Sequence, residues 1–172
     1  LVIGFKEGYL IAKYLPKQVH DMLLSFKNIE TFQNQRHQSI VLMSDLVGYT
    51  TITKILNEPV HVLDLMNDYL EATSLVLQDK YQGWLETYVG DMVCYYWPYR
   101  NENKEDSYRN ASLGALELAA LQKNFFSDIS KRYKNKFDNS MLENISNIIN
   151  AGIGLSEGTV IMGNLGPSKG VQ

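Results

Sequence analysis

The sequence predicts an α/β sandwich, in which helices pack on one sheet. Apolar runs rich in β-branched and aromatic residues read as strands, and longer segments with helical spacing lie between them. At 172 residues, of which 45% are apolar, the chain is long enough for one domain with a real core. Helical and extended segments alternate without an internal repeat, which favours a single mixed sheet with helices packed on it.

The first predicted strand spans Gln38–Leu46. Ile40 and Val41 lead an apolar run that is too continuous for a half-exposed strand, so we expect both of its faces to be covered. Gly48 predicts a tight turn directly after this strand. Upstream, residues 14–26 predict a short helix that is separated from the strand by a polar stretch.

Two helices are predicted next. Thr50–Leu56 forms a short one, and Pro59 opens a longer one that ends near Gly83, since proline suits the first helical position. The apolar face expected for the longer helix consists of Leu63, Met66, Leu70, Thr73 and Leu77.

A hairpin follows, with strands over Trp84–Val89 and Met92–Trp97. The dipeptide Gly90-Asp91 joins them, and a glycine-acid pair between apolar runs is a strong hairpin signal. Pro98 is expected to end the second strand, because proline has no N–H to donate.

The C-terminal half predicts one more helix and two short strands. The helix is alanine-rich, and its helical register contains Ala111, Ala115, Leu118, Gln122 and Phe125. After a polar connection, strands are expected at 151–155 and 159–165, on either side of a turn at 156–158.

Composition excludes several classes of protein. A net charge of −3 and a pI near 5.6 provide no electrostatic reason to expect nucleic acid or an anionic membrane as a partner. The single cysteine, Cys94, cannot form an internal disulfide. No run approaches the roughly 18–20 apolar residues of a membrane span. We therefore expect a cytoplasmic domain, attached to a membrane only through segments outside this chain.

Two aspartates carry the clearest functional signal. Asp45 lies at the end of the first predicted strand, and Asp91 lies at the predicted hairpin turn. Either one alone would usually be a turn residue or a helix cap. If the two strands are neighbours, however, both carboxylates meet at the rim of the sheet and can hold divalent cations against a polyphosphate. The stretch Leu46–Thr50 passes from strand through glycine into a helix start, where backbone N–H groups are open to phosphate.

These segments resemble a known family. Ser44-Asp-Leu-Val-Gly-Tyr-Thr50 resembles the opening signature of class III nucleotidyl cyclase catalytic domains, and Val89-Gly-Asp-Met-Val-Cys94 resembles the hairpin of that family. Gly152-Ile-Gly-Leu-Ser-Glu-Gly158 and Val160–Gly166 resemble its later glycine-rich segment. The resemblance runs over almost the whole chain in the correct order, and it implies a ferredoxin-like, palm-type sheet.

The resemblance also implies a site. Asp45 and Asp91 would be the catalytic carboxylates and, together with Leu46, would bind two Mg²⁺ or Mn²⁺ ions. The nucleotide and its phosphates would be held by Leu46, Val47, Gly48, Tyr49, Thr50 and Gly90. The substrate would be ATP, or less readily GTP, and the active site would form in a homodimer or in a pair with a related cyclase domain.

Two departures from the family pattern qualify this expectation. Thr87 occupies the position that carries a purine-reading Lys or Glu in the family, and the adjacent Glu86 is expected to point to the opposite face of its strand. The family's segment with the remaining purine, ribose and transition-state residues would follow Gln172. Residues 1–36 are thus expected to be a lead-in helix and linker, and 37–172 a catalytic domain incomplete at its C-terminal end.

Three functions remain open on the sequence. The first is a cyclase that makes cyclic AMP in a signalling protein. The second is a catalytically weak cyclase-homology domain that dimerises and transmits a signal; Thr87 supports it, whereas the intact pair Asp45 and Asp91 argues against it. The third, a palm-type polymerase or cyclic-dinucleotide synthase, fits the glycine pattern around Asp45 less well.

Overall fold

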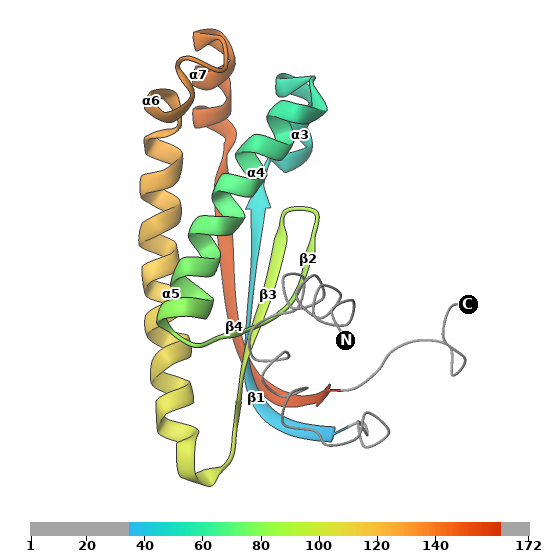
Figure 1. Ribbon diagram of the computed structural model, residues 1–172, viewed down its shortest axis with the longest axis vertical. Helices are drawn as coiled ribbons and strands as arrows, with labels where there is room; N and C mark the ends of the chain where they lie inside the picture. The colour runs from blue at the N-terminus through green and yellow to red at the C-terminus, as the bar shows by residue number, and fades with distance from the viewer. Residues whose placement is uncertain (1–34, 163–172) are drawn as a thin grey trace, which may run out of the picture. The chain divides into compact units, whose positions relative to one another are not determined.

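The computed structural model describes residues 35–162, which fold into one sheet covered by helices (Figure 1). The lead-in helix predicted for residues 14–26 lies outside this range, and the predicted domain boundary at 36/37 stays a prediction. The strands are β1 (Gln35–Val47), β2 (Trp84–Val89), β3 (Met92–Tyr99) and β4 (Asn150–Met162). The helices are α3 (Tyr49–Leu56), α4 (Pro59–Ser74), the π-helical η2 (Leu75–Lys80), the 3₁₀ turn η3 (Asn101–Asn103), α5 (Lys104–Ser127), α6 (Ile129–Tyr133) and α7 (Asn139–Ile148).

The strands lie in the order β2-β3-β1-β4. β2 and β3 are antiparallel, and Figure 1 places the arrowhead of β1 beside α3, at the same end of the sheet as the β2–β3 turn. The C-terminal end of β1 thus lies beside the N-terminal end of β3, so these two strands are antiparallel as well. A β-α-β-β-α-β chain with this strand order is the ferredoxin-like arrangement. The predicted fold class is confirmed.

Ser39–Gly158 form one compact unit, and the first residues of β1 and the last residues of β4 belong to a second one. Within the second unit, the Gln38 side-chain amide donates a hydrogen bond of 3.0 Å to the hydroxyl of Thr159. The start of β1 and the end of β4 therefore lie side by side.

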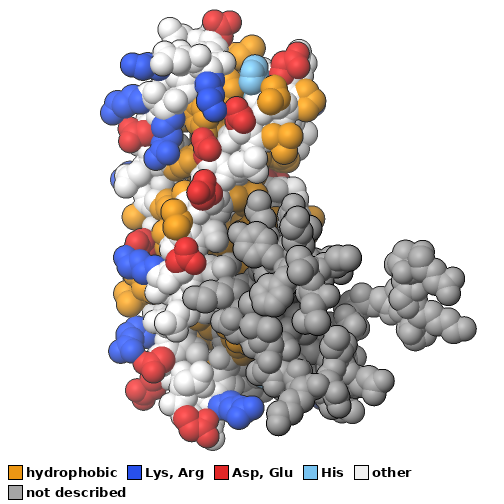
Figure 2. Space-filling view, in the orientation of Figure 1, with side chains coloured by type: hydrophobic (Ala, Val, Ile, Leu, Met, Phe, Trp, Pro, Cys, Tyr) orange, Lys and Arg blue, Asp and Glu red, His pale blue; other side chains and the backbone are white. Residues whose placement is uncertain are grey.

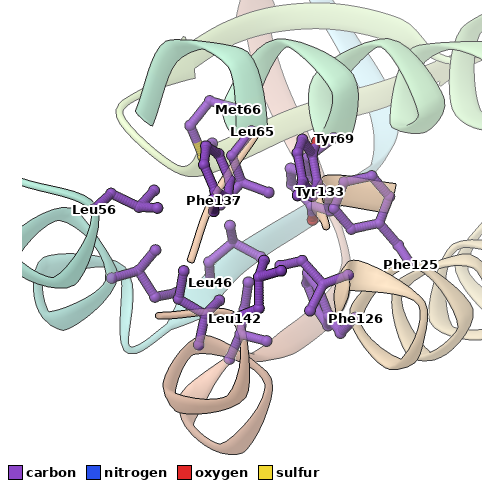
Figure 3. Packing of buried hydrophobic residues seen from close by; sticks show 14 residues of the cluster. Leu46, Leu56, Leu65, Met66, Tyr69, Phe125, Phe126, Tyr133, Phe137 and Leu142 are labelled. Atoms are coloured by element: carbon purple, nitrogen blue, oxygen red, sulfur yellow. The ribbon is translucent and has the colours of Figure 1, made fainter. Parts of the chain in front are cut away.

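The core of the first unit consists of two clusters of buried side chains between the sheet and its helices. One cluster joins the end of β1 to α3, α4, the end of α5, α6 and α7, and Figure 3 shows its members converging from these elements. The other joins β1 and β3 to η2 and α5. Leu42 belongs to the second cluster and Leu46 to the first, although both lie on the same face of β1.

The first strand, the two following helices and the hairpin are confirmed, with three corrections. The expectation that both faces of the first strand are covered is wrong, because burial alternates along β1: Leu42 and Leu46 are buried, whereas Met43 is 49% exposed. Leu63 is 59% exposed rather than part of the apolar face of α4, because Leu65 and Tyr69 face the core beside the predicted Met66. Pro98 does not end β3, which continues to Tyr99. A proline can lie within a strand where no ladder hydrogen bond is required from its nitrogen.

The C-terminal half differs more from the prediction. The expected hairpin around residues 156–158 is wrong, because β4 runs without interruption over 13 residues. The acid that suggested a turn, Glu157, instead accepts a hydrogen bond from the hydroxyl of Tyr99. The stretch expected to be a polar connection contains the helix α7, whose buried residues Leu142 and Ile145 have helical spacing. Its Asn and Ser content obscured this spacing.

Acidic and basic side chains are interspersed over the face seen in Figure 2, with no field of one sign. This agrees with the small net charge of −3. None of the helices in the described range is both long and apolar enough to cross a bilayer.

Candidate functional site

Asp45 and Asp91 come together at one end of the sheet. Asp45 lies two residues before the end of β1 and is exposed, while Asp91 occupies the turn between β2 and β3 and is half-buried. The strand order makes β1 and β3 neighbours, and the two carboxylates lie within hydrogen-bond reach of each other. The sequence predicted this convergence, and the structure places both residues accordingly.

Opposing influences set the pKa of Asp91. Burial raises the pKa of Asp91, and so do the charge and the side-chain contact of Asp45. Hydrogen bonds from the backbone N–H groups of Asp91 and Leu46 lower this pKa, but the net effect is a raised pKa. The site therefore holds two like charges close together in a partly buried place, which is the arrangement that a bound cation would relieve.

The segment after Asp45 turns sharply into a helix. Leu46 is buried and anchors the strand, Val47 is exposed, and Gly48 adopts a left-handed backbone with φ of 86° just before α3. The carbonyl of Gly48 accepts hydrogen bonds of 2.9 Å from Thr51 and Ile52. The earlier N–H groups, at Tyr49 and Thr50, precede the first intrahelical bonds, as is general at a helix start. Beside the aspartates, this turn can accept an anion.

Gly48 is enclosed on one side by α7. A Cβ atom at this position would lie 2.5 Å from Cγ2 of Ile148 and 3.2 Å from its carbonyl oxygen. Both the left-handed backbone and this close approach require glycine. The helix α7, which the sequence analysis did not predict, thus constrains the predicted turn at Gly48.

The hairpin contains a bulge where the purine position was expected. Leu85 pairs with Tyr95 and Thr87 pairs with Cys94, so Glu86 is the extra residue. The regular alternation that the sequence analysis assumed at Glu86 does not hold, because the bulge interrupts it, and the carboxylate of Glu86 lies beside the Cys94 thiol. The turn itself is formed by Gly90, with φ of 63° and an open surrounding.

Polar residues behind the aspartates were not predicted as functional. Ser44, Tyr69 and Gln122 are buried and joined by hydrogen bonds from the Gln122 amide, 2.8 Å to each of the other two. The available signal was the interruption of apolar faces, by Ser44 in β1 and by Gln122 in α5.

The residues at this site fit a divalent cation by their chemistry. Hard cations such as Mg²⁺ prefer carboxylate oxygens and commonly use only one or two of them, together with water and substrate phosphates. Across residues 35–162, no group of three His, Cys, Asp or Glu side chains is placed to hold a metal. None of the ion pairs that these residues form with one another involves Asp45 or Asp91.

Known proteins resemble this chain in sequence and in fold. No protein-family model matches it. A protein named adenylate cyclase from Anabaena cylindrica is 27% identical over 140 residues, which are 81% of this chain and 25% of that protein. The chain thus spans about a quarter of the length of this curated relative.

Solved structures share the fold. A bacterial light-regulated adenylyl cyclase superposes with a TM-score of 0.68 at 24% identity, over 95% of this chain and 43% of that one. The guanylyl cyclase Cya2 gives a TM-score of 0.61 at 20% identity, over 79% of this chain and 61% of that one. The resemblance indicated by the motifs is confirmed, and this chain has the fold of the class III nucleotidyl cyclase catalytic domains.

Proposed function

We propose that this domain converts ATP, and less readily GTP, into the 3′,5′-cyclic nucleotide and pyrophosphate. The observation that carries the proposal is the contact between the carboxylates of Asp45 and Asp91, beside the turn that starts α3. A sequence relative named adenylate cyclase and the shared fold support the same class of reaction.

In this proposal the chain's residues bind and orient the substrate. Asp45 and Asp91 would hold two Mg²⁺ or Mn²⁺ ions, with the carbonyl of Leu46 as a further oxygen ligand. When bound, such ions would activate the ribose 3′-hydroxyl and neutralise the triphosphate. The backbone from Leu46 to Thr50, with Gly90, would hold the phosphates, because N–H groups at a helix start favour anions.

The site would be completed in a dimer, either of two copies or with a related cyclase domain. The solved relatives include a guanylyl cyclase domain described as a non-canonical dimer. In the dimer, Thr87 would occupy the purine-facing position. The preference for ATP rests on the names of the relatives rather than on Thr87.

A titration of nucleotide with and without Mn²⁺ tests the proposal. We expect the α-thio analogue of ATP to bind at least 10-fold more tightly when Mn²⁺ is present, because the aspartates and the phosphates repel each other without a cation. Asp45→Asn should abolish this difference. Glu102→Gln, which changes an exposed acid in η3, should preserve it. Equal binding with and without Mn²⁺ would contradict the proposal.

The second candidate is a cyclase-homology domain that dimerises without turnover, and the absence of Lys or Glu at Thr87 favours it. Product assays with ATP and GTP separate the two candidates. A domain of this second kind should bind nucleotide without a response to Mn²⁺ and form neither cyclic nucleotide.

A further inference from the structure

Four polar side chains meet in the core directly behind Asp45. Ser44 of β1, Tyr69 and Thr73 of α4, and Gln122 of α5 are at most 4% exposed. We call this set the polar layer. It lies where the two hydrophobic clusters meet, one with Leu46, Tyr69 and Phe125 and the other with Leu42 and Leu118. Apolar residues at these positions would avoid the cost of burying polar groups.

Gln122 is the centre of the polar layer. Its side-chain nitrogen donates one hydrogen bond to Oγ of Ser44 and one to the hydroxyl of Tyr69, both at 2.8 Å. Both amide protons are therefore used, and they point into the core. One residue of α5 thus fixes a point on β1 and a point on α4 at the same time.

The polar layer reaches the two aspartates by short routes. Ser44 and Asp45 are consecutive in β1, so the serine faces the helices and the aspartate faces the other side of the sheet. Holding the side chain of Ser44 therefore fixes the rotation of the strand at Asp45. On the helix side, Tyr69 belongs to α4; burial raises the pKa of its hydroxyl, and the charge of Asp91 in the hairpin turn adds to this, so the two groups lie near each other.

We propose that Gln122 is a positioning residue, which sets the relative placement of Asp45 and Asp91 by holding Ser44 and Tyr69. The inference rests on the proposed function, since metal binding is the property that needs this placement. Groups that orient the ligands of a metal without touching it typically change its affinity 10- to 100-fold.

The first test compares Gln122→Met with Ile145→Val for Mn²⁺ affinity and thermal stability. Methionine keeps the length of the Gln122 side chain and removes both of its amide hydrogen bonds. We expect Gln122→Met to weaken Mn²⁺ binding about 10-fold or more. Ile145 is fully buried in α7 and lies outside the polar layer, so Ile145→Val should lower Tm while leaving Mn²⁺ affinity unchanged. Unchanged affinity in Gln122→Met would overturn the inference.

A triple variant separates positioning from stability. Ser44→Ala, Tyr69→Phe and Gln122→Met together remove every partner of the two hydrogen bonds, so neither bond leaves an unsatisfied partner behind, and Tm should recover relative to Gln122→Met alone. Positioning predicts that Mn²⁺ affinity stays weak in the triple variant. If affinity recovers together with Tm, the polar layer only stabilises the fold.

A readout without metal keeps this inference distinct from the proposed function. If the unchanged protein shows no Mn²⁺ binding that depends on Asp45, the proposed function fails. The carboxyl carbon resonances of Asp45 and Asp91, measured by NMR at one pH without metal, then decide the placement. We expect them to broaden or split in Gln122→Met but not in Ile145→Val, and identical resonances in all three proteins would refute positioning by Gln122.

Discussion

Asp45 and Asp91 are 46 residues apart in the chain, yet their carboxylates lie against each other where β1 meets the β2–β3 turn. Two like charges in contact destabilise the fold unless a cation lies between them. Neutralising one of the two carboxylates should therefore stabilise the metal-free protein and weaken the binding of a metal.

Neutralising Asp91 should stabilise the metal-free protein. The pKa of Asp91 is raised on folding, so its contribution to stability is most favourable at low pH and is lost as pH rises through the folded pKa. At pH 7, Asp91→Asn should raise stability by up to about 1 kcal/mol, or Tm by about 2–4 °C. Saturating Mn²⁺ should raise Tm of the unchanged protein and of Glu102→Gln but not of Asp91→Asn. A variant less stable than its parent in the absence of metal would contradict the repulsion.

Gly48→Ala should damage both the fold and the site. The new methyl group would require a left-handed backbone and would lie 2.5 Å from Ile148. We expect a loss of about 1–3 kcal/mol in urea unfolding, together with weaker nucleotide binding. Ile148→Ala should recover only part of this loss, because it removes the clash but not the backbone strain. Gly154→Ala is the matched control, since its methyl group would meet nothing within 4 Å.

Cys94 should react slowly in the folded protein. Burial, with a further contribution from the adjacent Glu86 carboxylate, raises the pKa of the thiol from 9.0 to about 12. The thiolate fraction at pH 8 then falls roughly 10³-fold relative to an ordinary cysteine. Because it is the single cysteine, the rate of alkylation by iodoacetamide in buffer and in urea reports it directly. Equal rates under both conditions would show that the thiol is accessible and unperturbed.

Thr73→Val should be neutral or stabilising. The hydroxyl of Thr73 is buried and forms no hydrogen bond among the described residues, although it lies near the hydroxyl of Tyr69. Replacing an unsatisfied hydroxyl with a methyl group of similar size removes a desolvation cost of about 1–3 kcal/mol at most. Chemical unfolding measures the change, and a loss above about 1 kcal/mol would reveal a partner for this hydroxyl.

Glu157 should make stability sensitive to acid. Hydrogen bonds from Tyr108 and Tyr99, with Lys104 at 3.9 Å, lower the pKa of this carboxyl. A lowered pKa contributes stability that is present above the unfolded value near 4.5 and is lost as pH falls toward the folded value. Between pH 5 and pH 3, the unchanged protein should therefore lose more Tm than Glu157→Gln. If Tm fell equally in both proteins over this pH range, Glu157 would make no such contribution to stability.

The sequence by itself determined the hairpin at Gly90, the turn at Gly48 and the two aspartates, because each depends on local chemistry. Glycine permits a left-handed backbone, and alternating apolar runs define strands wherever they occur. The same local reasoning failed at residues 156–158, where a turn signal is overridden by partners on β3 and α5. It failed again at Glu86, because a bulge arises from the pairing of two strands.

Only the tertiary structure decided which side chains meet. Ser44, Tyr69 and Gln122 come from three elements spread over 79 positions of the chain, and no local pattern encodes their contact. The strand order that brings Asp45 to Asp91 depends likewise on how the helices cover the sheet. Local preferences act over a few residues, whereas hydrogen bonds and electrostatic repulsion between distant residues exist only after the chain has folded.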